Sequence, residues 1–399
     1  MTDHSQYQEP PTANAFTGRE RLLKTLAHQE PDRVPLDLGS TQVTGIHTIA
    51  YHRLRQALGL PPVQAQLSDT IQGLALPDPD LLARLGVDVR GLFPLNSHNW
   101  KVVTQEHGDY WTYFDEWGIT HRKPRPDGLY FSLWKAPLER PDLTPALIAH
   151  HPWPRLDDPQ RIAGLRQQAE AYRAAGYAVL LKDPFAGIFE MAQRIVGMEN
   201  LLVMMGTEKS LAAALFDKLV ALKLDFWEMA LPQLADVIDV ISQADDYGTQ
   251  ASQIISPRMF REQLKPRWKL IFDRLRQLAP DARRFFHSCG NVRPLLPDYI
   301  ELGVEILNPV HVRATGMEPA ALKRDFGDAL TFWGGGVDTQ GVLPNGTPEQ
   351  VRDDVRRNIE ALAPGGGFVF NTVHNIQADV PPENLLAMYA ALAEYGVYA

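Results

Sequence analysis

Short apolar runs alternate with segments of helical period along most of this chain. Eight runs are predicted as β-strands, at residues 34–39, 87–92, 178–182, 237–242, 283–287, 304–307, 330–333 and 367–370. Helical patterns separate most of them, and such alternation predicts a parallel α/β architecture. Eight strands are the number that closes a (β/α)8 TIM barrel. A doubly wound open sheet is the alternative, but no G-x-G-x-x-G pattern follows the first strand.

Helix starts are recognisable at two positions. Thr17 and Thr347 each precede an acidic or amide residue by three positions, which is the spacing of a capping box. A third helical pattern, over residues 256–272, contains Pro266. Proline lacks the N–H that a helix interior needs, so we expect a kink or a break there.

One region interrupts the alternation of strands and helices. Residues 93–155 are rich in aromatic side chains, Trp100 among them, and residues 105–110 read as a turn between two strands. We expect an aromatic-rich β insertion after the second strand, whose aromatic residues pack mainly against one another. We expect residues 1–16 to form a disordered lead and residues 17–399 to form a single (β/α)8 barrel domain that includes this insertion.

Composition excludes several classes of protein. The 399 residues are 45% hydrophobic and 22% charged, with a net charge of −9, which argues against a nucleic-acid partner. No run of 18 apolar residues exists, so we expect no membrane span. The first residues lack a secretory apolar segment, and Cys289 is the single cysteine, which excludes an internal disulfide. We therefore expect a cytoplasmic protein.

Polar and reactive residues follow the predicted strands. In a barrel, catalytic residues come from the carboxyl ends of the strands and the loops just after them. Residues at such positions are Asp37, Ser40, Asp183, Asp245, Asp246, His287, Cys289, Asn308, Asp338, Asn371 and His374. From these we take Asp246, Asp338 and Asn308 as candidate catalytic residues.

A metal site is suggested by His287 and Cys289, which form an H-x-C pair after a predicted strand. Imidazole and thiolate together suit zinc. A buried inert thiol beside a hydrogen-bonded histidine would give the same pattern. A third ligand has to come from elsewhere, and His374 after the eighth strand is the first candidate, with His311 as the second.

Two adjacent carboxylates, Asp245 and Asp246, end the fourth predicted strand. Neighbouring side chains of a strand point to opposite faces, so we expect one to face the cavity and the other to cap a helix or a loop. The cavity-facing carboxylate could orient a ligand histidine, bind metal or bind substrate. Asp338 brings a further carboxylate to the barrel mouth after a glycine run, although that run could also be a simple turn.

With these residues the sequence resembles the uroporphyrinogen decarboxylase superfamily. The resemblance covers most of the chain from Arg19 and is densest from Asp245 onward. The motifs that carry it are D-D-Y-G at 245–248, S-P-R-M-F at 256–260, H-S-C-G at 287–290, L-N-P-V at 307–310, G-F-V-F-N-T-V-H-N-I at 367–376 and P-P-E-N at 381–384. The resemblance implies a (β/α)8 barrel, in agreement with the strand count.

The superfamily has two branches. Its decarboxylases bind an acidic tetrapyrrole through an arginine-rich motif after the first strand and need no metal, whereas this chain has no arginine from residue 34 until Arg53. Its zinc-dependent methyltransferases work with corrinoid proteins and hold zinc with H-x-C and a later cysteine. His287 and Cys289 match that pair, and His374 stands where the later cysteine is expected. Decarboxylases also have a histidine at this last position.

The resemblance to the second branch implies zinc on His287, Cys289 and His374. It implies a methyltransferase of corrinoid-linked methyl transfer or demethylation, which activates a thiol-type acceptor on zinc. The methyl carrier is expected to be cobalamin, as a corrinoid protein or as methylcobalamin, and the acceptor a small molecule. The alternatives are a metal-free decarboxylase of the same fold and a non-catalytic corrinoid- or tetrapyrrole-binding protein. A homodimer is expected by analogy alone.

Overall fold

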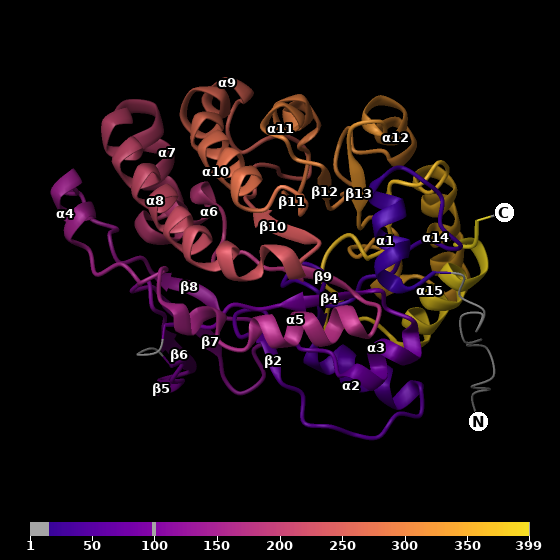
Figure 1. Cartoon of the computed structure of the whole chain (residues 1–399). Helices are drawn as coiled ribbons and strands as arrows, with labels where there is room; N and C mark the ends of the chain where they lie inside the picture. The colour runs from indigo at the N-terminus through magenta and orange to yellow at the C-terminus, as the bar shows by residue number, and fades with distance from the viewer. Residues whose placement is uncertain (1–15, 98–100, 399) are drawn as a thin grey trace.

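The computed structural model describes residues 16–97 and 101–398, so residues 1–15 of the predicted lead at 1–16, and Trp100, lie outside the described residues. Its centre is a parallel sheet of seven strands in the order β14-β13-β12-β11-β10-β9-β4 (Figure 1). The strands are β4 (Val89–Leu92), β9 (Ala178–Leu181), β10 (Val240–Ala244), β11 (Arg283–His287), β12 (Ile306–Asn308), β13 (Thr331–Trp333) and β14 (Phe368–Val369). Seven of the predicted strands are therefore present, with boundaries that differ from the predicted ones by at most three residues.

The first predicted strand, at residues 34–39, is not a regular strand, and this prediction is corrected. Pro35 has no N–H to donate, so a continuous ladder cannot pass through it. The segment nevertheless contacts both edges of the sheet. Phe370 donates its N–H to the carbonyl of Pro35 (2.8 Å), and Asp88 donates to the carbonyl of Leu36 (2.9 Å). The segment fills the place between β14 and β4, and the sheet curls into a barrel-like α/β fold.

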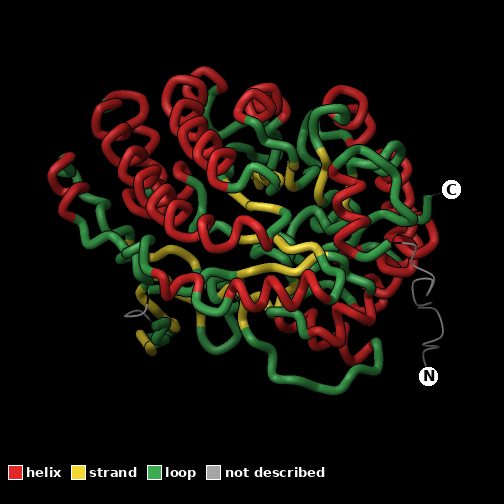
Figure 2. The backbone as a smooth tube through the Cα atoms, viewed as in Figure 1, coloured by secondary structure: helices red, strands yellow, loops and turns green. Residues whose placement is uncertain are grey.

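Most of the helices pack around the outside of the curled sheet, while α4 lies away from it (Figure 2). The α-helices of the described residues are α1 (Gly18–Leu26), α2 (Thr48–Ala57), α3 (Pro79–Leu85), α4 (Pro145–His150), α5 (Leu165–Ala174), α6 (Ile188–Val196), α7 (Met198–Thr207), α8 (Lys209–Leu234), α9 (Pro257–Met259), α10 (Lys265–Leu278), α11 (Leu296–Leu302), α12 (Pro319–Phe326), α13 (Val342–Asn345), α14 (Pro348–Leu362) and α15 (Pro382–Tyr395). Among the described residues, no helix is long and apolar enough to cross a membrane.

The predicted helix signals are confirmed in three places. Thr17 and Thr347 form the capping boxes of α1 and α14. The helical pattern around Pro266 is broken, because a π-helical turn over Phe260–Leu264 separates α9 from α10. Pro266 then lies in the first turn of α10, where its missing N–H costs no hydrogen bond.

The inner face of the sheet carries its own apolar cluster. Its members are Leu22, Leu26, Val43, Val89, Ala178, Leu180, Val240, Phe285, Ile306, Trp333 and Val369. Because side chains alternate along a strand, residues two positions further toward the carboxyl end also face inward. By this alternation, the side chains that point toward the interior of the barrel include those of Lys182, Ser242, His287 and Asn371.

Two small antiparallel sheets accompany the barrel. The first consists of β5 (Gln105–His107), β6 (Tyr110–Phe114), β7 (Thr120–Pro124) and β8 (Ser132–Lys135), and its β5–β6 hairpin contains the predicted turn. Its Tyr113 ring packs edge-on against Phe131, with the ring centroids 4.9 Å apart. The second sheet was not predicted and consists of β1 (Ile46–His47), β2 (Leu67–Asp69) and β3 (Leu74–Ala75).

Candidate metal centre

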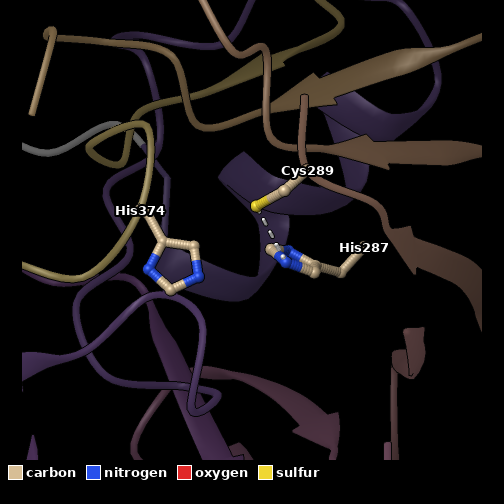
Figure 3. A group of neighbouring side chains, drawn as sticks. All are labelled: His287, Cys289 and His374. Carbon is tan, nitrogen blue, oxygen red and sulfur yellow. Dashed lines mark hydrogen bonds between the residues drawn. The ribbon is translucent and has the colours of Figure 1, made fainter. Parts of the chain in front are cut away.

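His287, Cys289 and His374 come together at the carboxyl ends of the strands (Figure 3). His287 is the last residue of β11, Cys289 follows it by two residues, and His374 lies in the loop after β14. One potential ligand atom of each residue lies within 4.8 Å of the other two. The structure therefore groups the three residues that the sequence suggested as metal ligands.

The ring of His287 is held by Asn308, the last residue of β12. Nδ1 of His287 lies 2.5 Å from Oδ1 of Asn308, and Nδ2 of Asn308 donates to the carbonyl of Trp333 (2.7 Å). The second contact fixes the amide so that its oxygen faces the ring. Nδ1 of His287 therefore carries the hydrogen, and the lone pair of Nε2 is directed into the site.

The thiol of Cys289 meets this lone pair, since its Sγ lies 3.4 Å from Nε2 of His287. The N–H of Cys289 donates to Oδ1 of Asp246 (2.8 Å). The loop is held by a close backbone crossing, because a Cβ on Gly248 would lie 2.4 Å from the carbonyl oxygen of Cys289. Gly290 follows in the left-handed region with φ +80°, which glycine adopts without strain.

The imidazole of His374 faces His287 edge-on, with the ring centroids 5.5 Å apart. Burial lowers the pKa of His374 to about 3, and the neighbouring His287 and His311 add to this effect. A neutral imidazole offers a lone pair to a metal, so His374 is ready to bind one at neutral pH.

The three donors fit zinc in chemistry and in spacing. Donor atoms of a tetrahedral zinc site lie about 3.3–3.7 Å apart, given bonds of about 2.0–2.3 Å. The Nε2–Sγ distance of 3.4 Å already meets this value. Since the ligand atoms all lie within 4.8 Å of one another, the donor atom of His374 needs to move by up to about 1.5 Å to reach this spacing. Three protein ligands would leave one position open, as in catalytic zinc sites.

The two adjacent carboxylates have the separate roles that we expected. Asp245 is fully buried and accepts hydrogen bonds from the N–H groups of Phe189 and Glu190, so it caps the first turn of α6. Burial raises the pKa of Asp245 to about 7. Asp246 faces the cluster, where its Oδ1 lies 3.6 Å from Nε2 of His287. Its side chain is 37% exposed, and desolvation raises its pKa despite the opposing effect of His287.

Asp338 has contacts that mark it as a residue of a turn. Its carboxylate accepts from the N–H groups of Gln340, Gly341 and Val342 and from the guanidinium of Arg313. These donors occupy the oxygens, and none of them belongs to the metal cluster. The contacts of Asp338 therefore favour the simple-turn interpretation over a catalytic role.

His311, the second candidate for the third ligand, lies outside the cluster. Its Nδ1 accepts the N–H of Gly290 (3.0 Å), and its Nε2 lies near the side-chain amides of Gln250 and Gln340. His311 thus holds the loop after β11 in place.

Sequence reasoning missed a charged pair in the first turns of α6. Glu190 and Arg194 are ion-paired at i, i+4 spacing. The charge of Glu190 contributes to the raised pKa values of Cys289 and Asp246, so this carboxylate lies close to the cluster. The one clue to this pair in the sequence is that α6 begins a few residues after the carboxyl end of β9.

The fold and the site together define a barrel-like α/β protein with a candidate metal centre at the carboxyl ends of its strands. The sequence model of the uroporphyrinogen decarboxylase (URO-D) family matches residues 137–395. The chain belongs to the uroporphyrinogen decarboxylase family.

Two known proteins extend this comparison. A stretch of 73 residues is 36% identical to a uroporphyrinogen decarboxylase from Pseudoalteromonas translucida (strain TAC 125), and it covers 18% of this chain and 20% of that protein. The match therefore spans about a fifth of the curated relative. The structure is similar to that of a methyltransferase from Methanosarcina mazei, with a TM-score of 0.60 and 18% identity over 95% of this chain and 99% of that one. At this identity the similarity concerns the fold.

Proposed function

We propose that this protein is a zinc-dependent methyltransferase of corrinoid-linked methyl transfer or demethylation. The observation that carries the proposal is the grouping of His287, Cys289 and His374, with the lone pair of His287 directed at the sulfur of Cys289. The fold shared with a methyltransferase and the arginine-free segment from residue 34 to Arg53 support it. Carboxylate-rich tetrapyrroles are usually bound by arginine.

His287, Cys289 and His374 would hold the zinc ion. Zinc in such a site supplies a positive charge that lowers the pKa of a bound thiol and makes its thiolate available near neutral pH. Asn308 orients His287 through Nδ1. The proposed methyl donor is a corrinoid protein or methylcobalamin, and the proposed acceptor is a small thiol.

Asp246 is the group that can take the proton of the acceptor. Its carboxylate lies beside Nε2 of His287, and desolvation raises its pKa, so protonation costs less than for an exposed carboxylate. The thiol proton passes to Asp246 or to solvent. The sulfur then forms a bond to the methyl carbon while the bond from this carbon to the donor breaks, and its electron pair stays on the donor.

Metal analysis and a transfer assay test the proposal. We expect close to one zinc per wild-type chain and a loss of most of it in Cys289→Ala and His374→Ala. His150→Ala, on the exposed helix α4, is the matched control and should keep the metal. Wild type should methylate a small thiol from methylcobalamin, and the two ligand variants should not. A protein without zinc that is insensitive to chelators and releases CO₂ from a carboxylic acid would overturn the proposal in favour of a metal-free decarboxylase.

A further inference from the structure

The two candidate ligand histidines differ in how their rings are held. Asn308 orients the ring of His287, whereas the imidazole of His374 makes no hydrogen bond among the described residues. The ring of His374 contacts that of His287 edge-on, and Figure 3 shows it reaching the cluster from a separate loop. The position of its ligand atom therefore depends on the backbone of that loop, residues 371–377.

The first half of this loop is held by the loop after β13. The N–H of Gly336 donates to the carbonyl of Asn371 (2.9 Å), and the N–H of Val373 donates to the carbonyl of Val337 (3.2 Å). These bonds fix the chain as it approaches His374. The chain beyond the histidine is held by other elements.

Asn375, the residue directly after the histidine, fastens the second half of the loop. Its side chain is 0% exposed, and both ends of its amide are engaged. Its Oδ1 accepts the N–H of Gly45 (2.6 Å), while its Nδ2 donates to the carbonyl of Gln42 (2.8 Å) and to Oε1 of Gln72 (2.8 Å). Because a buried amide is costly to leave unpaired, these three partners together determine where Asn375 lies.

Gln72 connects this amide to the first of the two small sheets. It lies in the turn between β2 and β3, where its backbone N–H donates to Oδ1 of Asp69 (2.7 Å). Its Nε2 lies 3.4 Å from the carbonyl of Gln42, to which it donates, so its Oε1 is the end of the amide that faces Asn375. The turn of one small sheet thus contributes a side chain to the anchor of the histidine loop.

Tyr130 connects the same loop to the four-stranded sheet. It precedes β8, and its hydroxyl donates to Oε1 of Gln377. Nε2 of Gln377 in turn donates to the carbonyl of Asn375 (3.0 Å). The ring of Tyr130 packs edge-on against His47, with the centroids 5.8 Å apart. Both small sheets therefore meet at Asn375, one residue from the candidate ligand.

We propose that Asn375 is a positioning residue for His374, and that Gln72 and Tyr130 couple the metal centre to the two small sheets. The ligand atoms lie within 4.8 Å of one another, so bound zinc has to draw the histidine loop inward. The anchor at Asn375 sets where this movement starts. The inference rests on the proposed function, because the position of His374 affects zinc only if zinc is bound there.

Zinc affinity, measured by competition with chelators, tests the positioning role. Asn375→Ala should weaken zinc by about 10–100-fold, as contacts behind a metal ligand typically contribute. Gln72→Ala and Tyr130→Phe each remove one outlying hydrogen bond and should weaken zinc by about 3–10-fold. Gln168→Ala, on the exposed side of α5, is the matched control and should bind zinc as wild type does.

Double variants distinguish positioning of one ligand from general support of the fold. The effect of Gln72→Ala should disappear in a His374→Ala background, where no ligand is left to position, and it should persist in an Asn308→Ala background. An equal loss in both backgrounds would overturn the proposal, because the contact would then stabilise the whole site. Wild-type affinity in Asn375→Ala, Gln72→Ala and Tyr130→Phe would overturn it as well.

Amide hydrogen exchange of the metal-free protein measures the loop without zinc. Asn375→Ala and Gln72→Ala should accelerate exchange by about tenfold or more in residues 371–377 and leave residues 283–291 unchanged. The two segments are compared within one variant, so partial unfolding cannot imitate this result. Acceleration in both segments, or in neither, would overturn the anchoring role.

The two measurements separate this inference from the proposed function. A wild-type protein that binds no zinc and transfers no methyl group would overturn the proposed function. Exchange then still decides whether Asn375 anchors the loop of His374. Zinc binding and methyl transfer in wild type, with affinity unchanged in the three single variants, would overturn the positioning role alone.

Discussion

The side-chain amide of Asn308 decides which nitrogen of His287 carries the hydrogen. Asn308 donates to the carbonyl of Trp333 with one end of its amide and receives Nδ1 of His287 with the other. The amide cannot turn over without setting its NH₂ group against the N–H of the ring and its oxygen against a carbonyl. A contact between two strand ends, β11 and β12, thus prepares Nε2 of His287 as a ligand atom.

Asn308→Ala should weaken zinc binding by about 10–100-fold, because contacts behind a ligand histidine typically contribute this much to metal affinity. Competition with a chromophoric chelator measures the change. Asn200→Ala, on the exposed part of α7, is the matched control and should bind zinc as wild type does. Unchanged affinity in Asn308→Ala would show that another group orients the ring.

The two neighbouring carboxylates should respond in opposite ways to truncation. Asp245→Ala leaves the N–H groups of Phe189 and Glu190 without a buried acceptor, so the free energy of unfolding should fall by about 2–4 kcal/mol. Asp246→Ala should change stability little, since that side chain is 37% exposed, and it should slow methyl transfer by about 10²–10⁴-fold. Urea denaturation and a transfer assay on both variants give the comparison. Equal losses of stability would contradict the division of roles.

Gly248 should be intolerant of even one added carbon. A Cβ there would lie 2.4 Å from the carbonyl oxygen of Cys289, so Gly248→Ala has to displace the loop that carries the thiol. We expect lower thermal stability together with weaker zinc binding. Gly206→Ala is the matched control, because its Cβ meets nothing within 4 Å and alanine favours the helix α7. Stable, zinc-replete Gly248→Ala protein would show that this crossing is not needed to place Cys289.

Much of the site was predictable, because the features that carry it are local. The alternation of apolar runs located seven of the strands, and the H-x-C pair marked the end of β11. His374 could be added because topology brings the carboxyl ends of all barrel strands to one face. These predictions require only the order of strands and helices along the chain, and no knowledge of how their side chains pack.

The parts that sequence reasoning missed depend on contacts between distant segments. The orientation of the Asn371 amide is set by the hydrogen bonds from its Nδ2 to the carbonyls of Asp37 and Thr44, more than 300 residues away. The contacts of Asp338 are of the same kind, since its position at a strand end is visible in the sequence but its hydrogen bonds from Arg313 and three backbone N–H groups are not. The broken first strand reflects Pro35, whose missing N–H can be read from the sequence.

Zinc binding should release a proton from Cys289, so the affinity should depend on pH. Burial, with the charges of Asp246 and Glu190, raises the pKa of Cys289 above its ordinary value, and the thiol stays protonated through neutral pH. The pKa of His374 is lowered to about 3, so this ring is already neutral and releases nothing. Because zinc binds the thiolate, the apparent affinity should rise by about tenfold per pH unit from about pH 7 to 8.5. Calorimetry in two buffers of different ionisation enthalpy counts the released proton directly. An affinity that stays constant over this range, with no buffer dependence, would mean that Cys289 either is ionised before zinc arrives or is not a ligand, and zinc analysis of Cys289→Ala distinguishes these two cases.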